Sequence, residues 1–195
     1  PMPATCTVTL DHLGGCVNQK EYEVSNLYVG DLNEFTVALN AAETEVTGVT
    51  VSESSDGAAD ATYGLVEFSF EGTTLDLVEE GTHDDDGKNT WTDTLENLKV
   101  YSPDTTDDAV VRNLLGSEIW GIVKLKGKEG ESQYKYRTFG VNGGVKFKNL
   151  RRAVTGQSWE MGINGSGEIR QVYFKPSAAA DAAAIDTAIA SLIRS

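Results

Sequence analysis

Stretches in which apolar and polar residues alternate recur along most of this chain. Two clear examples are "YGLVEFSFEG" (residues 63–72) and "NTWTDTLENLKVYS" (residues 89–102). Successive side chains of a β-strand point to opposite faces of its sheet, so a period of two residues predicts strands that bury one face. Turn residues separate these stretches at short intervals, which favours antiparallel hairpins. The pattern therefore predicts a mainly β chain that folds as an antiparallel β-sandwich or barrel.

Two hairpins are expected among the predicted strands. Residues 63–72 should pair with residues 73–80, and residues 117–127 should pair with residues 132–140. Short polar segments such as "NGSG" (164–167) are expected to separate strands as turns. The predicted strands are residues 5–10, 20–30, 34–40, 45–52, 63–72, 73–80, 89–102, 117–127, 132–140, 144–154, 157–163 and 168–175.

The hydrophobic period changes to that of a helix in two places. Residues 106–115 have Thr106 as the predicted N-cap, acidic residues in the first turn and Gly116 after the last turn. The alanine-rich C-terminal segment is predicted to be a helix over residues 177–195, capped by Ser177. Its apolar face, which should dock on the same chain or on a neighbouring copy, consists of Ile185, Ile189, Leu192 and Ile193.

These elements predict a single domain over residues 1–195, with about ten strands, a central helix and a C-terminal helix.

The sequence has no apolar run of about eighteen residues, so we expect no transmembrane helix and no membrane partner. The N-terminus lacks a basic region followed by an apolar run, so we expect no signal peptide. Cys6 and Cys16 could pair with each other, but two cysteines do not make a disulfide framework, and we expect reduced, buried thiols.

An acidic segment, "VEEGTHDDDGKNTWTD" (residues 78–93), resembles a calcium loop at first sight. With Gly87 in the sixth position of an EF-hand loop, the first ligand would be Thr82, which carries no charge. The last would be Asp93, which is shorter than the usual glutamate. The flanking residues also have the period of strands. We therefore predict a solvated acidic loop over residues 79–90 and no metal site.

Side chains that commonly perform catalysis are scarce and scattered. The two histidines, His12 and His83, lie in separate polar segments, and neither has the spacing of a metal site. Cys16 lies four residues after His12, but a local turn provides no pocket for a nucleophile and its base. We predict that the protein is not an enzyme and needs no cofactor.

The charge is divided unevenly along the chain. Residues 1–123 contain 24 acidic and four basic residues, a net charge of −20, whereas residues 124–195 contain six acidic and twelve basic residues, a net charge of +6. If the two parts occupy different faces, the acidic surface of one copy can meet the basic surface of the next. The basic stretch "KFKNLRR" (146–152) could also contact the phosphates of a nucleic acid. The total charge of −14, however, would repel such a polyanion.

Short strands throughout, a long acidic loop in the first half, a mid-chain helix and a C-terminal part containing "GINGSGEIRQVYFK" (162–175) resemble the tail tube proteins of long-tailed bacterial viruses. The resemblance implies a β-sandwich flanked by a helix. It also implies hexameric rings whose inner strands form a continuous barrel, stacked head to tail into a virion tail tube that conducts DNA without binding it specifically. Such a protein is made in the cytoplasm of the bacterial host and contacts other tail proteins.

The resemblance gives the acidic loop a role, because a long loop in this family commonly reaches a neighbouring subunit. The acidic side chains would then meet basic side chains of the next copy. The predicted contact residues are Glu79, Glu80, Asp84, Asp85, Asp86, Lys146, Lys148, Arg151 and Arg152.

Two other functions fit the same sequence. A capsid decoration or head–tail joining protein would have the same β-rich, self-associating character. A secreted carbohydrate-binding β-sandwich would instead present exposed aromatic residues on one face, for which Trp91, Trp120 and Trp159 are the candidates.

Overall fold

The structure is a computed structural model that describes residues 24–52, 54, 56–69, 77–101, 105–125, 136–141, 143–153, 158–167, 171–179 and 181–194. Within these ranges the chain is mainly β, as the alternation predicts, and two helices accompany the strands. The predicted strand at residues 5–10 lies outside the described residues, as do Cys6, His12 and Cys16.

Most element boundaries lie within a few residues of those predicted. The helices are α1 (Thr105–Leu114) and α2 (Ala182–Ala190), and a short 3-10 helix covers Leu32–Glu34. The strands are β1 (Val24–Asp31), β2 (Phe35–Leu39), β3 (Glu45–Val51), β4 (Val66–Ser69), β5 (Leu77–His83), β6 (Asn89–Tyr101), β7 (Ile119–Leu125), β8 (Tyr136–Phe139), β9 (Lys146–Ala153), β10 (Ser158–Gly167) and β11 (Val172–Phe174).

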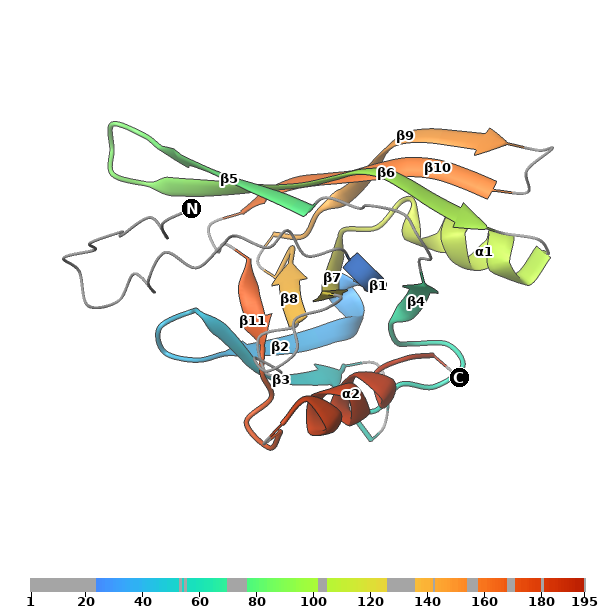
Figure 1. The fold of residues 1–195 in the computed structure, drawn as a ribbon, viewed down its shortest axis with the longest axis horizontal. Helices are drawn as coiled ribbons and strands as arrows, with labels where there is room; N and C mark the ends of the chain where they lie inside the picture. Colours follow the sequence, from blue (N-terminus) through green and yellow to red (C-terminus); the bar gives the residue numbers. More distant parts are fainter. Residues whose placement is uncertain are drawn as a thin grey trace, which may run out of the picture.

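The strands form two sheets that pack face to face. A seven-stranded sheet has the order β2-β3-β11-β8-β7-β1-β4, and a four-stranded sheet has the order β5-β6-β10-β9. Neighbouring strands are antiparallel except β11 and β3, which are parallel. Figure 1 shows the four-stranded sheet as the upper layer and α2 below the seven-stranded sheet, so the latter lies in the middle.

The central strand β7 is buried on both faces. Ile119 and Val123 point into a core between the two sheets, to which α1 contributes Val111 and Leu114. The alternate residues of β7 point the other way, into a second core beneath α2. The part of a strand that is covered on both faces is apolar throughout, as "IWGIV" (residues 119–123) is.

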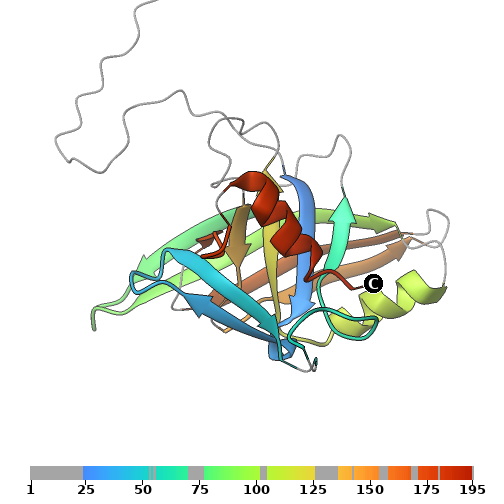
Figure 2. The ribbon, with the colours of Figure 1, turned by 90° about the horizontal axis from the view of Figure 1, so that it is seen from below.

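Helix α2 closes the second core. Its residues Ile185 and Ile189, together with Leu192 just beyond it, are buried against the seven-stranded sheet. Figure 2 shows α2 lying across β1 and β7. The prediction that this apolar face docks on the protein is confirmed within the same chain.

Polar contacts hold α2 and the residues after it in place. Asp186 accepts hydrogen bonds from Tyr136 Oη (2.5 Å) and Lys124 Nζ (2.7 Å). Burial raises the pKa of the Tyr136 hydroxyl, and the Asp186 carboxylate raises it further, so the hydroxyl stays protonated and donates. Beyond the helix, Arg194 Nη2 lies 3.0 Å from both carboxylate oxygens of Glu34.

The predicted hairpin between residues 63–72 and 73–80 is wrong. Strand β4 pairs with β1, with Phe68 opposite Leu27, and β5 pairs with β6 in the other sheet. Alternation identifies both strands, but it does not specify their partners. Pairing β4 with β1 packs Phe68 against the core between the sheets, which a local hairpin would not ensure.

The segment "NGSG" (164–167) continues strand β10 and is not a turn. Its residues pair with β6, where Asn164 Nδ2 donates to Thr94 Oγ1 (3.0 Å) and Ser166 Oγ lies 2.8 Å from Thr92 Oγ1. Gly165 is required by a close approach, because a Cβ there would lie 2.5 Å from Val145 Cα. The small residues of this segment therefore allow β10 to pass close to the backbone at Val145.

Both helices begin at residues other than those predicted. Helix α1 begins at Thr105, so Thr106 lies inside its first turn. Helix α2 begins at Ala182, and its N-cap is Asp181, whose side chain accepts from the Ala184 backbone N–H (2.9 Å). The Ser177 backbone N–H instead donates to the Thr47 carbonyl (2.9 Å), which extends the contact with β3.

The docking of α2 gives the first testable prediction. The double variant Ile189→Asp/Leu192→Asp should release the C-terminal segment to proteases, because each buried side chain contributes about 1.5–3 kcal/mol and the new carboxylates would be buried without partners. The matched control is Thr187→Asp/Ala190→Asp, which adds the same charges on the exposed face of α2. Equal proteolytic resistance of the two variants at this segment would contradict the docking.

Candidate functional site: the two edges of the four-stranded sheet

All nine predicted contact residues lie on the four-stranded sheet or its hairpin turn. The acidic ones belong to β5 and the turn that follows, and the basic ones belong to β9. The strand order places β5 and β9 at opposite edges, separated by β6 and β10 (Figure 1). The structure therefore gathers the acids at one edge and the bases at the other, and it does not bring the two groups together within one copy.

The acidic segment is a β-hairpin. Residues Glu79–His83 belong to β5, which corrects the predicted loop over residues 79–90, and His83 pairs with Asn89 on β6. The turn is short: the Gly87 N–H donates to the Asp84 carbonyl (3.1 Å), and Gly87 has φ +81°. A type I turn followed by a left-handed glycine is a common three-residue hairpin loop.

This turn uses Asp84 for its own closure. The Lys88 backbone N–H donates to Asp84 Oδ1 (2.7 Å), and the Asp84 N–H donates to the Lys88 carbonyl (3.0 Å). Among the described residues, no group of three or more His, Cys, Asp or Glu side chains is arranged to hold a metal ion. Asp85 and Asp86 are exposed at the end of the hairpin, which projects beyond the body of the protein in Figures 1 and 2.

Adjacent acids on β5 face opposite ways. Glu80 pairs with Thr92 on the outer face of the sheet, whereas Glu79 pairs with Asp93 on the face that covers the core. Glu79 accepts a hydrogen bond from the Gln171 backbone N–H. Glu79 therefore holds the start of β11, and Glu80 is the β5 carboxylate that points away from the protein.

Asp93 is the acidic residue that the sequence analysis did not recognise as structural. It is only 5% exposed and accepts from Gln171 Nε2 (2.9 Å) and the Gly140 N–H (3.3 Å). Burial raises the pKa of Asp93, and nearby Glu79 adds to the rise, although the two donors oppose it. The signal was present in "TWTDTL", where alternation places Asp93 on the same face as Trp91 and Leu95.

The outer face of the four-stranded sheet is polar in its middle. Thr92 and Ser166 lie side by side across β6 and β10, and Asn164 bonds to Thr94. Hydroxyl and amide groups thus separate the acidic edge from the basic edge.

The basic edge is irregular. Asn149 has φ +56°, and the register of β9 against β10 shifts between Glu160 and Gly162, which marks a β-bulge at Asn149 and Leu150. Lys146, Arg151 and Arg152 are exposed, and Lys146 Nζ lies 3.5 Å from Glu118 Oε1.

The exposed large hydrophobic residues also lie at these two edges. Among the described residues they are Val78 on β5, 39% exposed, and Leu150 on β9, 46% exposed. Each edge therefore combines charge, an apolar side chain and strand backbone with no further partner strand among the described residues, as a pairing surface does.

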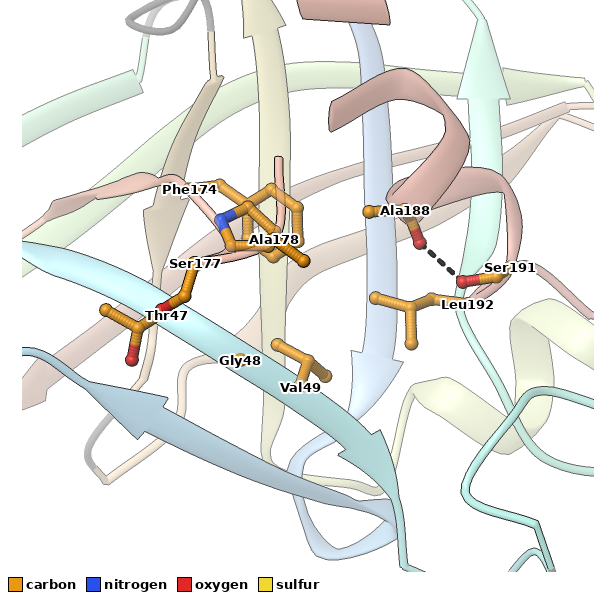
Figure 3. A pocket seen from close by; sticks show the side chains of 10 residues that line it. Thr47, Gly48, Val49, Phe174, Ser177, Ala178, Ala188, Ser191 and Leu192 are labelled. Carbon is orange, nitrogen blue, oxygen red and sulfur yellow. Dashed lines mark hydrogen bonds between the residues drawn. The ribbon is translucent and has the colours of Figure 1, made fainter. Parts of the chain in front are cut away.

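A cavity beneath α2 is a poor candidate for chemistry. A space of about 310 Å³ lies between β3, the residues after β11 and α2 (Figure 3). The described residues that line it have no ionisable side chain, and Ser191 Oγ already donates to the Ala188 carbonyl (2.7 Å). It offers no acid, base or charged group for a reaction.

The two tryptophans whose side chains the structure describes do not form the exposed aromatic face that a carbohydrate-binding module would need. Trp120 is 0% exposed and packs edge-on against Phe35, with ring centroids 5.2 Å apart. Trp91 is half-buried, and its ring lies over Gly81. The side chain of Trp159 lies outside the described residues.

Comparison with protein-family models, with curated proteins and with solved structures found no match to this chain. No helix among the described residues is long and apolar enough to cross a membrane. The function must therefore be inferred from the two edges themselves.

The buried carboxylate gives the second prediction. Because the folded protein raises the pKa of Asp93, wild-type stability should fall as the pH rises from the unfolded value of that pKa through the folded value. The variant Asp93→Asn lacks this loss, so its stability relative to wild type should increase over the same interval in urea unfolding. Glu80→Gln, on the outer face, serves as the control. Parallel pH profiles for wild type and Asp93→Asn would contradict the burial of this charge.

Proposed function

We propose that this protein is a structural subunit that assembles with copies of itself through the two edges of its four-stranded sheet. The observation that carries the proposal is the placement of acidic β5 and basic β9 at opposite edges of one sheet. An exposed strand edge carries unpaired N–H and C=O groups and is a template for another strand. Complementary charge at the two edges favours pairing of unlike edges over pairing of like ones.

The strand directions are compatible with a closed ring. Each of the four strands is antiparallel to its neighbour, so β5 and β9 run in opposite directions. When copies are related by rotation about a ring axis, β9 of one copy meets β5 of the next in the antiparallel sense. Such a heterologous contact produces a ring if the rotation closes. The four-stranded sheets then join into one continuous barrel that has no open edge.

The assembly we favour is the hexameric ring of a phage tail tube, stacked head to tail. Six sheets of four strands would exceed the 16 to 18 strands that already leave an aqueous channel in porins, so the barrel would enclose a channel. The polar outer face of the sheet would line it. The exposed Asp85 and Asp86 at the projecting turn would reach a neighbouring copy.

The charge distribution suits passage of DNA without specific binding. Phosphate binding grows with the number of Lys and Arg contacts. At each junction Glu80 would lie near basic residues of β9, and hydroxyl groups would line the wall between junctions. The total charge of −14 also opposes retention of a polyanion. In this function the protein belongs to the virion tail, is made in the bacterial cytoplasm and contacts other tail proteins.

The third prediction tests assembly itself. The purified protein should sediment as rings or longer tubes at low salt, visible by negative-stain microscopy, and molar salt should reduce this population because charge attraction is screened beyond about 3 Å. Arg151→Glu should reduce assembly strongly. Arg112→Glu, the same change on the exposed side of α1, should not. A wild-type protein that stays monomeric at all concentrations would contradict the proposal, and rings that never stack would favour a head–tail joining protein.

A further inference from the structure

We infer that neighbouring copies pair β9 with β5 in one register, in which Glu80 lies opposite Arg151, Glu79 opposite Arg152 and Asp84 opposite Lys146 of the next copy. This inference rests on the proposed self-assembly and adds the register of the contact. Four features of the structure lead to it: the facing of the side chains, the bulge in β9, the positions of the acidic and basic residues, and the positions of the uncharged residues.

The face of the sheet to which each β5 side chain points limits which β9 residues can lie opposite it. Directly paired residues of adjacent strands point to the same face of a sheet. Glu80 pairs with Thr92, whose hydroxyl bonds to Ser166 on the outer face, so Glu80 is on the outer face. Glu79 is on the opposite face, which covers the core. An antiparallel partner must therefore place an outer residue opposite Glu80 and an inner residue opposite Glu79.

The bulge determines which β9 residues are outer. Lys146 pairs with Asn164, which bonds to Thr94 on the outer face, and Lys148 pairs with Gly162. Asn149 and Leu150 together occupy one step of the ladder, so Arg151 returns to the outer face although it is three residues after Lys148. Arg152 then belongs to the inner face. Without the bulge, Lys148 and Arg151 would face opposite ways.

Registers that preserve facing differ by steps of two residues. When Glu80 is opposite Lys148, Thr82 falls opposite Lys146 and Val78 opposite Arg151, which leaves one acid–base pair. When Glu80 is opposite Arg151, the pairs with Arg152 and Lys146 form as well. A further shift of the register by two residues in the same direction places Thr82 opposite Arg151. Acid–base pairs then form only at the turn between β5 and β6, and none forms along β5. The register with Glu80 opposite Arg151 therefore forms the most acid–base pairs along the strand.

The uncharged residues favour the same register. The bulge, where two β9 residues occupy one step, falls opposite Gly81, which has no side chain of its own and lies under the ring of Trp91, so Leu150 would approach an apolar surface there. Val78 falls opposite Ala153, so an exposed apolar side chain of β5 meets an apolar residue type instead of Arg151. Charge, size and polarity thus agree on one alignment of the two edges.

Disulfide cross-linking can distinguish the registers. Residues directly opposite in an antiparallel pair have Cα atoms about 4.5–5.5 Å apart, within disulfide range, whereas diagonal positions are about 7–8 Å apart. The test uses the full chain with Cys6→Ser and Cys16→Ser, so that only introduced thiols react. In this background, Glu80→Cys/Arg151→Cys should give at least about fivefold more cross-linked subunits on mild oxidation than Glu80→Cys/Lys148→Cys.

A charge exchange provides an independent measurement. Arg151→Glu alone should reduce assembly in sedimentation, and Glu80→Arg/Arg151→Glu should restore most of it. Glu80→Arg/Lys148→Glu, in which the new arginine at position 80 would lie opposite Arg151, should stay below wild type in assembly. Circular dichroism of each variant shows whether it remains folded.

The outcomes separate the register from the function. If rings form but the Glu80–Lys148 pair cross-links preferentially, or neither pair does, the register is wrong and the proposed assembly stands. If neither wild type nor any variant sediments above the monomer, both the assembly and the register are wrong. Preferential cross-linking at Glu80 and Arg151, with recovery in the exchange variant, supports both.

Discussion

Burial of both faces of the seven-stranded sheet is the constraint on which the rest of this structure depends. Strand β7 sends Ile119 and Val123 to one side and Trp120 and Ile122 to the other, so neither face can remain in water. Helix α2 covers one face, and the four-stranded sheet with α1 covers the other. The four-stranded sheet packs on the rest of the protein through one apolar face, which leaves its outer face polar and, among the described strands, leaves its two edges open.

Those open edges connect the fold to the proposed function. A buried sheet edge must satisfy its backbone groups, and an exposed one must either resist or accept another strand. Here the two edges carry opposite charge, each has one exposed apolar side chain, and a bulge in β9 sets which basic residues face outward. These features favour a specific heterologous contact between copies. Gln171, next to β11, donates hydrogen bonds to Glu79 and Asp93. These bonds support this arrangement because they connect β5 and β6 to the seven-stranded sheet beside the acidic edge.

The helical spacing of apolar residues predicted the docking face of α2, and alternation predicted nearly every described strand and the mainly β class. Alternation could not predict strand partners, because a two-residue period specifies which face is buried and not which strand lies alongside. Residues 63–72 and 73–80 were therefore paired wrongly. The nine contact residues were predicted from their charge and from the resemblance to tail tube proteins, and their separation onto two edges depends on the strand order. Alternation also places Glu79 and Glu80 on opposite faces of the sheet, which the prediction of a loop over residues 79–90 did not take into account. Alternation could likewise have identified Asp93 as buried.

Amide hydrogen exchange measured as a function of protein concentration would test the central claim most directly, because it observes the backbone of each edge. If β9 of one copy pairs with β5 of the next, amides of these two strands should exchange rapidly in dilute monomer and become protected on assembly. Amides of β6 and β10, already paired within the copy, should change little. Concentration-dependent protection confined to β2 or β4, the edges of the other sheet, or no change at β5 and β9 in assembled protein, would contradict the account.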